Sequence, residues 1–264
     1  MDGAMGTLIA STQKDSLNLT SPELIQSIHR QYLDAGADIL KTNTFNSNSG
    51  PQDYAVNVAG ARLARARADE YTAANPLQPR YVAGAMGPGR DGNASIDAYF
   101  EQARGLVDGG VDMLLAETVT SIRTAQSAMA AFEKLFVKIG RELPVLLSVT
   151  VSKDGALISG ESLAAFWNAV STYRLYAVGM NCGLGLKQSR PFLEELSRTS
   201  TTKVSFHPSA GLPNADGGYD ETPEEFATIF GDLAMRGQVD IVGGCCGTTP
   251  AHIQAISRVT IDRL

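Results

Sequence analysis

The sequence lacks the features that indicate binding to a membrane or to a nucleic acid. No stretch approaches the roughly 18 consecutive apolar residues of a membrane-spanning helix. The start, MDGAMGTLIASTQK, lacks the basic residues and the long apolar run of a signal peptide. Lys and Arg number 22 against 28 Asp and Glu, for a net charge of −6, and a phosphate backbone normally needs a clustered basic excess. These absences predict a cytoplasmic protein that acts on small molecules, without a nucleic-acid or membrane partner.

Cysteine is also scarce, with three residues in the chain: Cys182, Cys245 and Cys246. Three is an odd number, and adjacent cysteines such as the last two rarely bridge each other without strain. A cytoplasmic compartment is reducing, which further disfavours a disulfide. Metal binding or thiol chemistry is the better prediction for these side chains.

The rest of the sequence is typical of one α/β domain, and we expect residues 1–264 to form a single domain. With 44% hydrophobic residues, a chain of 264 residues can bury a full core. Short runs rich in Val, Ile and Leu alternate with segments of helical period, as in parallel βα units. The predicted strands are Asp38–Thr42, Tyr81–Ala85, Val111–Glu117, Val145–Thr150, Ala177–Asn181, Lys203–Phe206 and Asp240–Gly243.

The strand spacing predicts a (β/α)8 TIM barrel. It is roughly 33 residues, and 264 residues hold eight such units. The first strand of that barrel would lie before Asp2, where the sequence has only Met1. We therefore expect a barrel whose first strand is truncated.

Two helices are well marked in the sequence. Apolar residues recur at three- and four-residue steps from Ile122 to Ile139, which predicts one buried helical face. Ser21 is a predicted N-cap, followed by Pro22 in the first turn, and this helix should run to about Ala35.

All three cysteines follow predicted strands, at the end where a barrel of this type builds its active site. Cys182 follows one strand, and Cys245 and Cys246 follow another, so the barrel could bring them together at one mouth. Three thiolates suit zinc, whose catalytic sites use three protein ligands and leave a fourth position open. The alternative is two buried structural cysteines with a chance neighbour.

Other polar residues also follow strands. Glu117 and Asp2 could each hold a substrate ammonium group, and the alternative for each is a helix cap or a salt bridge at the barrel mouth. His207 could act as an acid or a base, although a histidine followed by Pro208 is more often a hydrogen-bonded structural residue.

Five motifs together resemble the homocysteine S-methyltransferase family. The closest likeness is to the N-terminal homocysteine-binding module of cobalamin-dependent methionine synthase, over nearly the whole chain and in the same order. The motifs are DGAMGT (Asp2–Thr7), TNTFN (Thr42–Asn46), GMNCGLG (Gly179–Gly185), AGLPN (Ala210–Asn214) and GGCCGTTP (Gly243–Pro250).

The resemblance implies a zinc-bearing TIM barrel that transfers a methyl group to homocysteine thiolate, giving methionine. By the family pattern, Asp2 and Glu117 face the substrate's amino group, and we predict Asn181 as a third substrate-binding residue. Backbone amides near the mouth would take the substrate's carboxylate. The zinc ligands, which are also the predicted catalytic residues, are Cys182, Cys245 and Cys246.

The methyl donor is the open part of this prediction. GGCCGTTP favours the branch that uses methylcobalamin, and this chain would then need a separate corrinoid- or folate-binding protein as its partner. S-methylmethionine or S-adenosylmethionine could instead donate the methyl group directly. The alternative to an enzyme is a non-catalytic relic that binds zinc or homocysteine. The sequence departs from the family at Ser209, where an asparagine close to the metal is common, and in shorter segments after Thr7 and Gly87.

Overall fold

The structure is a computed structural model that describes residues 1–9, 14–48, 50, 52–89 and 91–260. Strands and helices alternate along these residues. The strands are β1 (Ile39–Lys41), β2 (Tyr81–Met86), β3 (Met113–Val119), β4 (Val145–Val149), β5 (Ala177–Gly185), β6 (Lys203–Ser209) and β7 (Ile241–Val242). The helices are α1 (Leu17–Thr20), α2 (Pro22–Asp34), α3 (Asp53–Ala74), α4 (Ile96–Gly109), α5 (Ile122–Ile139), α6 (Leu163–Val170), α7 (Leu186–Thr199), α8 (Pro223–Met235) and α9 (Pro250–Thr260).

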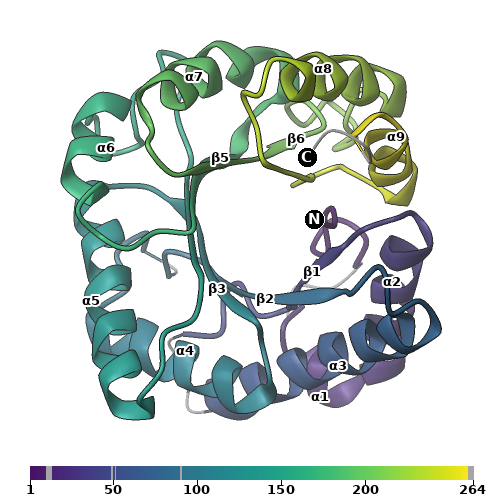
Figure 1. Cartoon of the computed structure of the whole chain (residues 1–264), viewed down its shortest axis with the longest axis vertical. Helices are drawn as coiled ribbons and strands as arrows, with labels where there is room; N and C mark the ends of the chain where they lie inside the picture. Colours follow the sequence, from purple (N-terminus) through teal and green to yellow (C-terminus); the bar gives the residue numbers. More distant parts are fainter. Residues whose placement is uncertain (10–13, 49, 51, 90, 261–264) are drawn as a thin grey trace.

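Within the described residues, the strands form one parallel sheet of seven, in the order β1 to β7. The sheet curls around a central axis and the helices surround it (Figure 1). This arrangement confirms the prediction of a TIM barrel with a truncated first strand. The predicted strands are all present, although β3, β5 and β6 run two to four residues further than the sequence pattern indicated.

The helix ends follow the local sequence in most places. Ser121 caps α5 by accepting a hydrogen bond from the backbone of Thr124, and Gly140, in the left-handed conformation with φ of 71°, caps the other end after Ile139. Ser21 is the N-cap residue of α2 but makes no side-chain cap bond, and its backbone N–H donates to the Leu17 carbonyl at the end of α1. None of the helices in the described part of the chain is both long and apolar enough to cross a membrane.

Two groups of buried apolar side chains lie on the two faces of the sheet. Val82 and Leu114 belong to the large group that packs between the strands and the helices. Their neighbours Ala83 and Met113 point inward, to a smaller group inside the barrel that also contains Met1. This alternation of faces along each strand is what a closed parallel barrel requires.

The first two residues lie between the two ends of the sheet. The Met1 ammonium group donates to the Val242 carbonyl at 2.8 Å, and the Asp2 N–H donates to the Ile39 carbonyl at 2.9 Å. The Asp2 carbonyl accepts from Gly244 at 3.1 Å. The N-terminus is drawn in the opening between β1 and the C-terminal part of the chain (Figure 1). Two residues therefore bridge the seam that a full first strand would fill, at the end where the strands finish.

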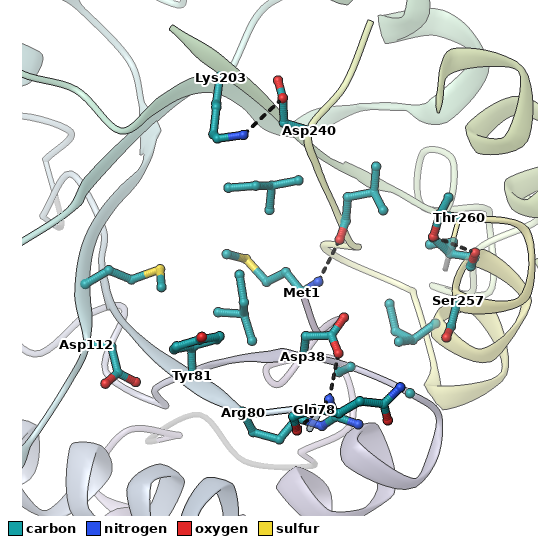
Figure 2. Close-up of a pocket in the computed structure, with 18 of the residues that line it drawn as sticks. Met1, Asp38, Gln78, Arg80, Tyr81, Asp112, Lys203, Asp240, Ser257 and Thr260 are labelled. Atoms are coloured by element: carbon teal, nitrogen blue, oxygen red, sulfur yellow. Dashed lines mark hydrogen bonds and ion pairs between the residues drawn. The ribbon is translucent and has the colours of Figure 1, made fainter. Parts of the chain in front are cut away.

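The other end of the seam opens into a cavity of about 760 Å3. Its wall includes the first residues of several strands and one face of α9, and Met1 points into it (Figure 2). Two ion pairs at its edge join Arg80 to Asp38 at 2.7 Å and Lys203 to Asp240 at 3.4 Å. The gap between β1 and β7 thus contains a space at the end of the barrel opposite the cysteines.

Candidate metal and substrate site

The structure brings the three cysteines together at the end of the barrel where the strands finish. Cys182 lies in β5, and Cys245 and Cys246 lie in the segment after β7. Their sulfur atoms all lie within 4.8 Å of one another, and the Sγ atoms of Cys182 and Cys246 are 3.7 Å apart. None of the three is in a disulfide, and each is half-buried. We call these residues the cysteine cluster.

The geometry of the cysteine cluster fits a tetrahedral zinc ion. Zinc–sulfur bonds of about 2.3 Å place two tetrahedral sulfur ligands about 3.8 Å apart. The sulfur atoms of Cys182 and Cys246 lie 3.7 Å apart, close to that value, and all three sulfurs lie within 4.8 Å of one another. The three residues are half-buried, so the cluster is not sealed inside the core. The donor set therefore suits a metal with one exchangeable position.

The thiols of the cysteine cluster share protons unequally. Hydrogen bonds from Cys245 and Cys246 lower the pKa of the Cys182 thiol, because they stabilise its thiolate. Hydrogen bonds with Cys182 and Cys246, together with burial, raise the pKa of Cys245. One negative charge on sulfur is thus stabilised by the cluster itself, and a divalent cation would supply the charge that the other thiolates need.

Two of the site residues, Cys182 and Glu117, lie where the pairing of the sheet is irregular. The register between β5 and β6 shifts between Asn181 and Gly185, and Cys182 lies in that shift with φ of 57°. The register between β3 and β4 shifts between Ala116 and Val119, a stretch that contains Glu117. Extra residues in one strand redirect side chains, and left-handed backbone at a residue other than glycine costs about 1–2 kcal/mol. The fold accepts that strain next to the cysteine cluster.

Asn181 connects these two irregular stretches. Its Oδ1 accepts hydrogen bonds from the Thr118 N–H at 2.8 Å and from Ser148 at 2.7 Å. Its Nδ2 donates to the Thr118 hydroxyl at 2.8 Å and lies 4.0 Å from the Cys245 sulfur. These contacts hold the loop ends in place. Direct contact of Asn181 with a substrate stays a prediction.

The two predicted amine-binding carboxylates are both buried near the cysteine cluster. Asp2 is 2% exposed and Glu117 is 6% exposed. The Asp2 Oδ2 accepts a hydrogen bond from the Lys41 N–H at 2.9 Å, while Oδ1 has no hydrogen-bond partner among the described residues. Burial raises the pKa of Asp2 to about 7, and burial also raises that of Glu117. These buried oxygens would gain from a cationic ligand.

Sequence reasoning missed Lys41, the last residue of β1. Its side chain is only 10% exposed, and its Nζ donates to the Gly244 carbonyl at 3.0 Å. The same Nζ lies 4.0 Å from the Asp2 Oδ1. The signal was present, because a lysine at the end of an apolar strand has to find charged partners when it is buried.

His207 and Ser209 lie on β6. Both ring nitrogens of His207 are buried without hydrogen-bond partners in the described part of the chain, and burial holds its pKa well below the usual value. His207 is therefore neutral at physiological pH. The Ser209 hydroxyl lies 3.8 Å from the Cys182 sulfur, so this departure from the family pattern also adjoins the cysteine cluster.

Comparison with known proteins gives one family and a set of similar folds. Residues 1–260 match the family described as homocysteine S-methyltransferase. The apo form of the homocysteine methyltransferase MmuM from Escherichia coli superposes with a TM-score of 0.75 and 25% identity, over 97% of this chain and 94% of that chain. Its metallated form gives 0.76 and 22%, over 98% and 94%. A ribulose-1,5-bisphosphate carboxylase/oxygenase from Pyrococcus horikoshii, at 14% identity and a TM-score of 0.61, covers 92% of this chain and 55% of that chain, and shows the barrel fold alone.

Proposed function

The chain belongs to the homocysteine S-methyltransferase family, and we propose that it transfers a methyl group to the thiolate of homocysteine, giving methionine. The observation that carries the proposal is the cysteine cluster, whose sulfurs lie within 4.8 Å of one another, beside two buried carboxylates. A thiol-reactive centre and an ammonium-binding centre in one barrel mouth match the two ends of this substrate. The metallated form of MmuM supports a bound metal, and three thiolate ligands favour zinc.

In this proposal Cys182, Cys245 and Cys246 hold the zinc ion and leave one position for the substrate sulfur. Zinc held by these three cysteines would supply the positive charge that favours the thiolate form of a substrate thiol near neutral pH, and three protein thiolates would leave that sulfur electron-rich. Asp2 and Glu117 accept hydrogen bonds from the substrate's ammonium group. Asn181 holds the backbone that carries Thr118 and lies next to the Cys245 sulfur.

For the donor we propose methylcobalamin carried by a separate corrinoid-binding protein. The GGCCGTTP motif supports this choice, since it resembles the branch of the family that uses methylcobalamin. The cysteine cluster is half-buried at the mouth of the barrel, where a second protein could approach it. Direct donation by S-methylmethionine or S-adenosylmethionine is the alternative within the same reaction.

One assay series tests the proposal. Purified protein should contain about one zinc per chain and should form methionine from homocysteine with one of three donors: methylcobalamin, S-methylmethionine or S-adenosylmethionine. Cys182→Ser should lose most of the zinc and the turnover, while Ser152→Ala, a hydroxyl change in the loop after β4, should keep both. Bound zinc and homocysteine without turnover on any donor would identify a non-catalytic binding protein. Full zinc retention in Cys182→Ser would show that the metal site is wrong.

A further inference from the structure

A lysine is buried at the seam of the barrel, next to the carboxylates of the proposed amine site. Lys41 is 8% exposed and contacts two segments that are far away in the sequence. Its Nζ donates to the Gly244 carbonyl at 3.0 Å, and its own N–H donates to the Asp2 Oδ2 at 2.9 Å. Burying an ammonium group is costly unless negative charge lies close to it. The surroundings of Lys41 therefore have to supply that charge.

The charges that face Lys41 come from three parts of the barrel. Glu117 on β3 acts most strongly, followed by Asp2 in the N-terminal segment and then by Cys245 and Cys246. Burial by itself would lower the pKa of the Lys41 ammonium, but these negative groups raise it above its usual value. Lys41 thus stays charged in the folded protein.

The position of this charge relative to Asp2 is specific. The Lys41 Nζ is 4.0 Å from the Asp2 Oδ1, which is too far for a hydrogen bond, and it bonds to the Gly244 carbonyl instead. The Oδ1 atom consequently keeps its lone pairs free while it sits beside a positive charge. A hydrogen-bonded ion pair would have occupied those lone pairs. Lys41 supplies charge here without occupying the acceptor.

We propose that Lys41 is a positioning residue for substrate specificity, whose charge favours the anionic forms of Asp2 and Glu117 as acceptors for the amino group of an α-amino thiol. This inference rests on the proposed function. Two carboxylates in a poorly hydrated site repel each other, so without a nearby cation one of them takes up a proton and stops acting as an acceptor. When both carboxylates are ionised, their charges and that of Lys41 sum to −1, which one substrate ammonium group balances.

A purely structural role at the seam predicts a different outcome. The seam is already joined by backbone hydrogen bonds from Gly244 to Asp2 and from Asp2 to Ile39. If Lys41 served only to hold the segment that carries the cysteine cluster, its loss would disturb the thiol end of the substrate as much as the amine end. The two roles can be separated with a ligand that lacks the amino group.

The test compares homocysteine with 4-mercaptobutanoate, which has the same thiol and carboxylate but no amino group. Lys41→Gln keeps a hydrogen-bond donor and removes the charge, and Lys41→Arg keeps the charge. Lys203→Gln is the matched control, because Lys203 is also paired with an aspartate but lies at the opposite end of the barrel. Affinities are measured by calorimetry on the zinc-loaded proteins, together with zinc content and melting temperature.

We expect Lys41→Gln to weaken homocysteine binding at least tenfold and to leave the binding of 4-mercaptobutanoate and the zinc content unchanged. Lys41→Arg should restore part of the preference for homocysteine, and Lys203→Gln should not change it. Equal losses for both ligands, or no loss for either, would overturn the inference while the proposed function stands. If Lys41→Gln does not fold, the same ratio is measured on Lys41→Met. A wild-type protein that binds zinc but neither ligand would instead overturn the proposed function, and the inference with it.

Discussion

Replacing Asp2 by Asn should change how the stability of this protein depends on pH. Asp2 is 2% exposed, and burial raises its pKa from 3.8 to about 7, against the opposing effects of the Lys41 charge and the Lys41 N–H. Between these two pH values the folded protein keeps a proton that the unfolded chain has lost. The free energy of unfolding therefore falls as the pH rises through this window, and the contribution of Asp2 is fully present only below about pH 4.

The size of the effect follows from the shift in pKa. Each unit is worth about 1.4 kcal/mol, so a rise from 3.8 to about 7 corresponds to about 4 kcal/mol. Asparagine does not ionise, and its side-chain oxygen can still accept the hydrogen bond from the Lys41 N–H. The stability of the Asp2→Asn variant relative to wild type should therefore increase by about 4 kcal/mol from pH 4 to above pH 7.

The assay is urea unfolding of the metal-free proteins at half-unit steps between pH 4 and pH 8. The quantity of interest is the change in the difference between variant and wild type, because a constant offset from altered contacts cancels. The variant should also lose affinity for homocysteine. A difference that stays flat, or that decreases as the pH rises, would show that Lys41 outweighs burial and that Asp2 is an ordinary carboxylate in the folded protein.

Three further predictions concern other buried groups. Glu117→Gln should weaken homocysteine binding by about 2–3 kcal/mol, as expected for the loss of a charge-assisted hydrogen bond, and should not change the zinc content. If calorimetry shows an unchanged affinity for homocysteine, Glu117 is a structural residue. His29 is fully buried, and burial lowers its pKa from 6.5 to about 4. The wild-type protein should therefore lose about 3 kcal/mol of its free energy of unfolding as the pH falls through this range. Urea titrations of His29→Leu should not show that loss. Five apolar residues added before Met1 would replace its buried ammonium group by a peptide N–H and would enter the cavity of about 760 Å3. The extended protein should therefore unfold at a Tm at least about 5 °C higher in calorimetric scans. An unchanged Tm would mean that Met1 and Asp2 already close the barrel.

Local patterns predicted most of the secondary structure. The α5 helix begins and ends at the residues that its apolar stripe indicated, because a buried helical face leaves a strong period in the sequence. The ends of β3 and β5 were harder to predict, since both strands continue through irregular stretches that contain Glu117 and Cys182. Such irregularities depend on the pairing of neighbouring strands, which a single sequence does not show.

The candidate site, too, was only partly predictable from the sequence. The cysteine cluster was predictable because three scarce thiols each follow an apolar strand, and a parallel barrel gathers the ends of its strands at one mouth. Asn181 was predicted to contact substrate, which stays a prediction, and its bonds to Thr118 and Ser148 could not be read from the sequence. The hydrogen-bond partners of a polar side chain are set by whatever lies opposite it in the fold.

By itself the sequence determined the barrel, the family resemblance and the position of three thiols at strand ends, because these depend on periodicity and on motifs that are local in the chain. Only the tertiary structure decided how the seam is bridged by Met1 and Asp2, and how Lys41 comes to lie between Gly244 and the carboxylates. Those contacts join residues about 40 to 240 positions apart, and their energies depend on burial and distance. Charge in a protein interior is governed by what surrounds it in space, so the electrostatics of this site follow from the fold.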